Sequence, residues 1–162
     1  MQTCYEEAAR IPLIIVDPRA TANGKVSKRT VELVDLYPTL TDLGGVSPPQ
    51  GLQGVTLRPL LNDVDAVWDR AAYTQTVTKG KDKVQGYSVR TERWRFTEWQ
   101  YGKKGLELYD HDKDPKELTN LATDPAYADV IKQLQAYSHS IHPVIVEPGK
   151  TLKKNKESKK GE

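Results

Sequence analysis

The aspartates Asp110, Asp112 and Asp114 alternate along the sequence, as the first ligands of a calcium-binding loop do. Such a loop has glycine at its sixth position and glutamate at its twelfth, where this sequence has Pro115 and Leu121. The residue that makes the turn and the bidentate ligand are therefore both missing. We predict a solvated loop here rather than a calcium site.

Histidine and cysteine are the other residues that could bind a metal or act as nucleophiles. His139 and His142 are three positions apart, without Glu, Asp or Cys at ligand spacing nearby, which favours a surface role at a helix end over metal binding. Cys4 is the only cysteine, which excludes a disulfide framework and a thiolate metal cluster. A nucleophilic cysteine needs a positioned base, and no histidine is near Cys4 in sequence, so we predict a half-buried structural thiol. The redox compartment stays open.

Three alternate lysines, Lys79, Lys81 and Lys83, form a basic loop. This loop could contact an anionic ligand, but a run of charges is more commonly just solvated. The sequence contains neither a glycine-rich phosphate loop nor a G-x-S-x-G nucleophile elbow. Taken alone, these residues indicate a small α/β piece with no visible active site.

The elements that would position these residues centre on an alternating stretch at residues 84–110. Apolar side chains recur at every second position and are interrupted at Thr91-Glu92-Arg93 and at Gly102 to Gly105, which predicts three antiparallel strands. A fourth strand is expected at residues 71–77. Asp124-Pro125 has the residues of a helix start, and the pattern that follows predicts a helix at residues 126–140 that covers one face of the sheet.

Residues 11–61 lack the alternating pattern of the later segment. Residues 11–16 are a continuous apolar run rich in β-branched residues, which predicts a strand buried on both faces. Pro38 and Gly44 suit the first turn and the end of a short helix, and residues 46–61 are expected to form an irregular loop. No other segment of the sequence could bury residues 11–16 well, which indicates that part of the structure is missing.

Composition supports a fragment and excludes some partners. The chain has 162 residues, 37% of them apolar, and a mean hydropathy of -0.65, which is thin for a self-sufficient core. The net charge of +2 comes from the tail, residues 150–162, because the remainder is slightly acidic. We therefore predict no nucleic-acid partner. No apolar run is long enough to span a membrane, and no signal segment opens the sequence.

Several ordered motifs resemble the C-terminal third of a sulfatase, closest to iduronate-2-sulfatase-like members of the alkaline-phosphatase superfamily. They are YEEAARIPLI at residues 5–14, VDLYPTLTDLG at residues 34–44, GYSVRT at residues 86–91, ELYD at residues 107–110 and DPKELTNL at residues 114–121. The resemblance implies the C-terminal part of an alkaline-phosphatase-like α/β fold, with an α+β section in which a small antiparallel sheet of about four strands packs on a C-terminal helix.

The resemblance also implies cofactors that this sequence does not hold. Sulfatases use calcium and a formylglycine made from Cys or Ser in a C-x-P-S-R or S-x-P-S-R motif, whereas Cys4 lies in C-Y-E-E-A. A family lysine that contacts the sulfate stands four residues before the aromatic matching Tyr5, a position that Met1 fills here. We expect no catalytic residue and no metal ligand in this chain, and we expect the sequence to lack the N-terminal sulfatase portion.

The resemblance divides the chain into three parts: residues 1–61 from the large sulfatase domain, residues 62–145 as a small C-terminal subdomain, and residues 146–162 as a Lys-rich disordered tail. By position, it implies that Gln75, Thr76 and Lys79 face the substrate cleft. Family members are commonly exported from the cytoplasm, but the location of this chain stays open. A bacterial source is expected.

Three hypotheses of function follow. The first is a C-terminal sulfatase fragment that is inactive alone. The second is a non-catalytic module that binds sulfated saccharides through the loop at residues 79–83. The third is a subunit that completes a two-chain sulfatase. The sequence does not say which sulfate ester the enzyme would cleave, whether the chain folds alone, or what its oligomeric state is.

Overall fold

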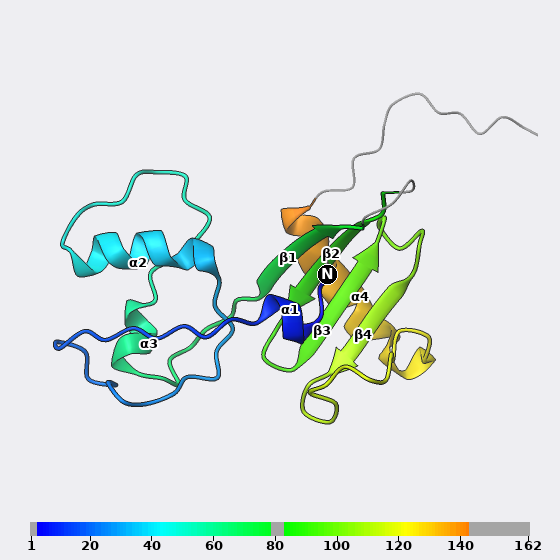
Figure 1. The fold of residues 1–162 in the computed structure, drawn as a ribbon, viewed down its shortest axis with the longest axis horizontal. Coiled ribbons are helices and arrows are strands. Elements are labelled where there is room, and N and C mark those ends of the chain that lie inside the picture. The colour runs from blue at the N-terminus through cyan, green and yellow to red at the C-terminus, as the bar shows by residue number, and fades with distance from the viewer. Residues whose placement is uncertain (1–2, 79–82, 143–162) are drawn as a thin grey trace, which may run out of the picture.

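Four antiparallel strands, paired in sequence order, organise the computed structural model, which describes residues 3–78 and 83–142 (Figure 1). The strands are β1 (Ala72–Val77), β2 (Gln85–Arg90), β3 (Trp94–Trp99) and β4 (Leu106–Asp110). Their alternating side chains predicted this meander, and the structure confirms it. The α/β fold class with a four-stranded sheet and a C-terminal helix is thereby confirmed as well.

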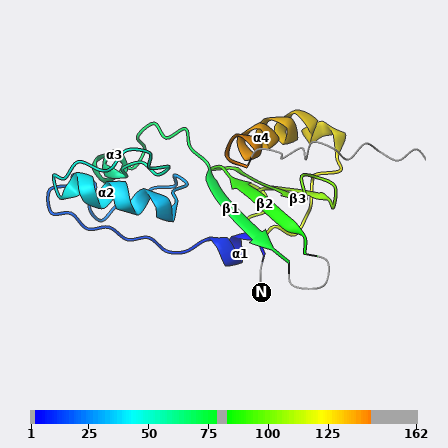
Figure 2. The ribbon, with the colours of Figure 1, turned by 90° about the horizontal axis from the view of Figure 1, so that it is seen from above.

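The core lies between one face of the sheet and α4 (Ala128–Ile141), as Figure 2 shows. Val89, Phe96 and Leu108 come from three adjacent strands and are fully buried, and they pack against Ile131 and Leu134 of the helix. This is the helix that the sequence predicted. The two-residue period of the strands and the three-to-four-residue period of the helix each put apolar side chains on one face. These two apolar faces pack against each other.

The start of this helical segment follows the predicted chemistry. The side chain of Asp124 accepts a hydrogen bond from the backbone N of Ala126 at 2.9 Å. Pro125 stands at the first position of a single 3₁₀ turn, η2 (Pro125–Tyr127), which leads into α4. Proline costs little there, because the backbone N–H that it lacks would have no partner in the helix.

The loop between β3 and β4 is longer than predicted. Gly102 and Gly105 have φ angles of 82° and 120°, as expected for glycines in a tight turn, but Gln100 and Tyr101 also have positive φ angles of 48° and 54°. The chain turns across residues 100–105 rather than at the glycines alone.

The outer edge of β4 is closed by a side chain. The amide of Asn120 accepts from the backbone N of Leu108 at 3.0 Å and donates to the backbone O of Leu106 at 3.1 Å. The backbone N of Leu121 then donates to the O of Leu108 at 2.9 Å. One asparagine thus takes the place of a neighbouring strand.

Residues 11–66 form a separate helical lobe beside the sheet, with η1 (Leu33–Asp35), α2 (Leu36–Leu43) and α3 (Arg58–Asn62) (Figure 1). Buried polar groups fasten α2 to the loop that follows it. The carboxylate of Asp35 accepts from the backbone N of Val55 at 2.9 Å, and the hydroxyl of Thr39 accepts from the backbone N of Leu57 at 2.9 Å. Buried hydrogen bonds thus hold these segments of the helical lobe together, whereas apolar packing holds the sheet and α4 together.

The predicted strand at residues 11–16 is wrong for this structure, because these residues form no strand. Ile14 and Val16 are 85% and 77% exposed, and within the described part of the chain the backbone of residues 11–16 has no backbone hydrogen-bond partner. A strand requires a neighbour to pair with, and the described residues supply none.

The two lobes meet through a few polar contacts. The backbone N of Tyr73, at the outer edge of β1, donates to Glu32 at 2.8 Å, and Arg29 pairs with Glu92 at 2.7 Å. In the described part of the chain, none of the helices is long and apolar enough to cross a membrane. The predicted tail, residues 146–162, lies outside the described residues.

Candidate functional site

The face of the sheet opposite α4 is polar although it is buried. The period of two that directs Phe96 toward the core directs Arg95 and Thr97 to this opposite face, next to Ser88 of β2. All three polar residues are 2% exposed or less, and the hydroxyl of Thr97 donates to that of Ser88 at 2.9 Å. A buried polar face of this kind requires partners for its charges.

Those partners form a cluster of five ionisable side chains, which we call the ionic cluster. Arg95 donates to Glu6 and to Glu117 at 2.5 Å each, and Arg90 donates to Glu6 at 3.2 Å. Its members come from α1 (Glu6–Ala9), β2, β3 and the turn after β4: they are Glu6, Arg90, Arg95, His111 and Glu117. Two carboxylates balance two guanidinium groups, so the buried charges are compensated.

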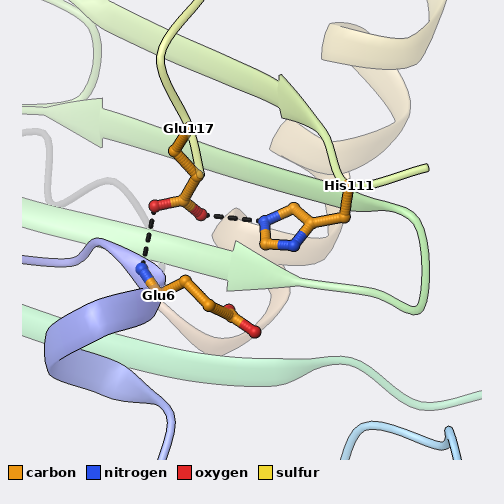
Figure 3. Close-up of side chains that lie close together, drawn as sticks. All are labelled: Glu6, His111 and Glu117. Carbon is orange, nitrogen blue, oxygen red and sulfur yellow. Dashed lines mark hydrogen bonds and ion pairs between the residues drawn. The ribbon is translucent and has the colours of Figure 1, made fainter. Parts of the chain in front are cut away.

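His111 connects Arg90 to Glu117, and Figure 3 shows its bond to Glu117. Arg90 lies 2.9 Å from Nδ1 of His111 and can only donate, so Nδ1 must accept. Nε2 therefore carries the hydrogen and donates to Glu117 at 2.8 Å. The arrangement fixes the neutral tautomer of the imidazole.

Glu6, His111 and Glu117 also have the donor types of a metal site, since each offers one ligand atom and these atoms lie within 4.8 Å of one another. Their present bonds argue against that use. Both carboxylates are bound by guanidinium groups, and a divalent cation would have to displace Arg95 and lie beside two positive charges. The donor set therefore does not suit a calcium ion.

The pKa values of the cluster follow from burial and from its internal pairs. Burial of Glu6 disfavours its ionised form, but the hydrogen bonds and charges of Arg95 and Arg90 outweigh it and hold the pKa of this carboxyl below its ordinary value. Burial lowers the pKa of the Arg90 guanidinium. Glu6 thus stays ionised and bound to its arginines.

Cys4 lies just before α1 and is 2% exposed. Burial raises the pKa of its thiol to about 11, so almost none of it is the reactive thiolate at neutral pH. The prediction of a structural thiol is confirmed, although the side chain is more fully buried than expected.

The orientation of Gln75, Thr76 and Lys79 toward a substrate cleft stays a prediction. Gln75 and Thr76 both lie on β1, the edge strand, where adjacent side chains point to opposite faces of the sheet. Gln75 is on the face that α4 covers, because it pairs with Tyr87, whereas Thr76 is on the face of the ionic cluster, because it pairs with Gly86. Lys79 lies outside the described residues.

The aspartates at 110, 112 and 114 are held by protein partners. Asp110 is 1% exposed and forms two hydrogen bonds with Arg93, at 2.7 and 3.0 Å, so the prediction that it is solvated is wrong. Asp112 is exposed, as predicted. Asp114 accepts from the backbone N of Thr119 at 2.8 Å and shapes the turn.

The histidines at the end of α4 contact the sheet. His139 lies 3.0 Å from the carboxylate of Glu98, which is 0% exposed and also accepts from the hydroxyl of Ser138. The ring of His142 packs on Tyr87 with centroids 4.6 Å apart, and burial lowers the pKa of this imidazole. The predicted surface role therefore applies to neither residue in full.

Sequence reasoning missed the ionic cluster. Glu6 and Glu117 are 111 positions apart, and charged residues are normally expected on the surface. A signal was nevertheless present: Arg95 stands at an interior position of a predicted strand, between the apolar Trp94 and Phe96.

Comparisons with known proteins match most of the chain. The family described as "N-sulphoglucosamine sulphohydrolase, C-terminal" matches residues 2–142. Arylsulfatase K of Canis lupus familiaris is 35% identical over 130 residues, which cover 74% of this chain and 23% of that protein. N-acetylglucosamine-6-O-sulfatase of Bacteroides thetaiotaomicron is 33% identical over 135 residues, which cover 80% of this chain and 24% of the relative.

A solved structure agrees with these relatives. The structure of a 2-O GAG sulfatase superposes with a TM-score of 0.58 at 32% identity and covers 66% of this chain and 23% of that one. The chain spans about a quarter of the length of the curated relatives it matches.

Proposed function

Because this chain belongs to the sulfatase family of the alkaline-phosphatase superfamily, as a C-terminal portion, we propose that it is the C-terminal part of an enzyme that hydrolyses a sulfate ester. The observation that carries the proposal is the family match over residues 2–142 together with the quarter of each relative that the chain covers. It is inactive without the rest of the enzyme.

The residues of this chain are consistent with a catalytic centre that lies in another part of the enzyme. The C-x-P-S-R motif is absent from the sequence, and the one cysteine is buried with a thiol pKa of about 11. The ionic cluster is neutralised internally and does not suit calcium. In this proposal the formylglycine and the calcium ligands come from polypeptide outside this sequence.

Exposed apolar surface on the helical lobe supports an N-terminal sulfatase portion as the partner. In residues 11–16 the side chains of Ile14 and Val16 are 85% and 77% exposed, and the backbone has no backbone hydrogen-bond partner among the described residues. Leu40 and Leu33, at and near α2, are 67% and 63% exposed. An apolar surface of this extent is typical of a surface that another polypeptide covers.

The substrate class we propose is a sulfated saccharide, cleaved by an iduronate-2-sulfatase-like enzyme. The names of two relatives support it, since one is an N-acetylglucosamine-6-O-sulfatase and the other a 2-O GAG sulfatase. That Gln75, Thr76 and Lys79 face the cleft stays a prediction; because Gln75 and Thr76 point to opposite faces of the sheet, only one of these two can face a cleft on a given side of it. The bacterial source expected from the sequence stays a prediction, because the relatives come from both animals and bacteria.

An activity assay with and without the upstream polypeptide tests the proposal. The purified chain should not hydrolyse an aryl sulfate or a sulfated disaccharide in the presence of calcium. The DNA upstream of Met1 is then sequenced for a C-x-P-S-R motif, either in frame or in a separate reading frame. Coexpression of that polypeptide should produce turnover.

The matched control replaces the cysteine of the C-x-P-S-R motif by alanine and should abolish the turnover. Hydrolysis by the 162-residue chain alone would disprove the proposed inactivity. Binding of sulfated saccharides by the chain, with no turnover even after coexpression, would support the binding-module hypothesis instead.

A further inference from the structure

The short helix α1 has no cap of its own. It contains four residues, and its N-cap residue, Tyr5, makes no side-chain capping hydrogen bond. A single helical turn is not stable in water by itself, because nucleation costs more than one turn returns. Some other part of the molecule must hold it.

Glu117 takes the place of the missing cap. One oxygen of its carboxylate accepts from the backbone N of Glu6, the first residue of α1, at 2.8 Å (Figure 3). A carboxylate at this end of a helix also interacts favourably with the helix dipole. The cap comes from the turn after β4, where Glu117 is 9% exposed and has a φ angle of 56°.

The side chain of Glu6 closes the arrangement in the opposite direction. Its carboxylate accepts from Arg95 at 2.5 Å and from Arg90 at 3.2 Å. Arg95, 2% exposed, also binds the second oxygen of Glu117. Removing either negative charge would leave a buried guanidinium short of a partner, which is strongly unfavourable.

We propose that Glu6, Arg90, Arg95 and Glu117 form a clamp that makes the order of residues 3–10 depend on the folded sheet. Residues 3–10 lead directly into the apolar run at 11–16. The clamp therefore fixes the position of the sheet relative to residues 11–16. If the proposed function holds, it also fixes the position of the sheet relative to the polypeptide that covers those residues.

Cys4 provides a probe for this clamp, because it is the only cysteine and is buried within the clamped segment. Its reaction with an aromatic disulfide reagent under native conditions reports opening of residues 3–10. Glu117→Gln keeps the shape of the side chain but removes its charge. It should accelerate labelling of Cys4 roughly tenfold to a hundredfold, the effect of losing a charge-assisted hydrogen bond.

Glu98→Gln is the matched control. Glu98 is a fully buried carboxylate on the same sheet, but it lies on the α4 face and binds Ser138 and His139. Its substitution should leave the labelling rate of Cys4 close to wild type at matched global stability, which tryptophan fluorescence in urea measures. Equal acceleration in both variants would show global loosening and overturn the clamp.

Unchanged labelling in a folded Glu117→Gln variant would also overturn the proposal. If that variant does not fold, Glu6→Gln replaces it, since this change removes the partner of Arg90 and leaves the Glu117 cap in place. It too must accelerate labelling. No step uses a sulfate ester, so failure of the clamp and failure of the proposed function are separate results.

Discussion

Gly86 is the position where one methyl group should have the largest measurable effect on the sheet. The ring of Trp99, which is paired with Gly86 across β2 and β3, lies directly against the glycine. A Cβ at Gly86 would stand 2.5 Å from Cζ3 of that ring and 2.8 Å from Cε3. In Gly86→Ala, the indole must therefore move.

The cost has two parts. Forcing an extra methyl into a packed site costs about 1–3 kcal/mol. Displacing the ring also weakens the hydrogen bond of 3.0 Å from its Nε1 to Glu107, which contributes about 1 kcal/mol. We expect Gly86→Ala to lower the free energy of unfolding by about 2–4 kcal/mol and the Tm by roughly 4–16 °C.

Urea unfolding followed by tryptophan fluorescence measures the loss, and a double-mutant cycle assigns it. In a Trp99→Val background the same glycine substitution should cost less than about 0.5 kcal/mol, because the clash is gone. Gly105→Ala is the control: its φ of 120° strains any side chain, but a Cβ there meets no atom within 4 Å. Its cost should not depend on Trp99. An equal cost of Gly86→Ala in both backgrounds would refute the reasoning.

Two further predictions concern the core and the response to acid. Leu108→Ala, at a fully buried site, should cost about 2–5 kcal/mol, whereas Leu118→Ala, at a site that is 80% exposed, should cost almost nothing in the same urea titration. Hydrogen bonds from Arg93 hold the pKa of Asp110 below its ordinary value, so its contribution to the free energy of unfolding is complete above about pH 4 and is lost as pH falls through the lowered pKa. Asp110→Asn should remove this part of the acid dependence, and an unchanged pH profile of unfolding would contradict the assignment.

The sequence predicted the sheet lobe well because its signals are local. Alternation within residues 84–110 defines the strands, and Asp124-Pro125 defines the start of the helical segment. Each signal acts over a few residues and needs no knowledge of the remainder of the fold.

The predictions that failed depend on partners. The run at residues 11–16 has the composition of an interior strand, but strand formation requires a neighbour that the described residues do not contain. The sequence did not predict the clamp for a related reason, because Glu6 and Glu117 come into contact only once the sheet has formed. Local patterns do not encode such a contact.

The asparagine at the edge of β4 hinders the addition of another strand to the sheet. Because the amide of Asn120 already occupies the backbone groups of Leu106 and Leu108, a foreign strand cannot add to that side without displacing it. The other edge of the sheet, β1, lies next to the helical lobe (Figure 1), and there the backbone N of Tyr73 donates to Glu32 at 2.8 Å. Side chains therefore occupy backbone groups at both edges, and a strand that added along the whole length of either edge would have to displace one of them.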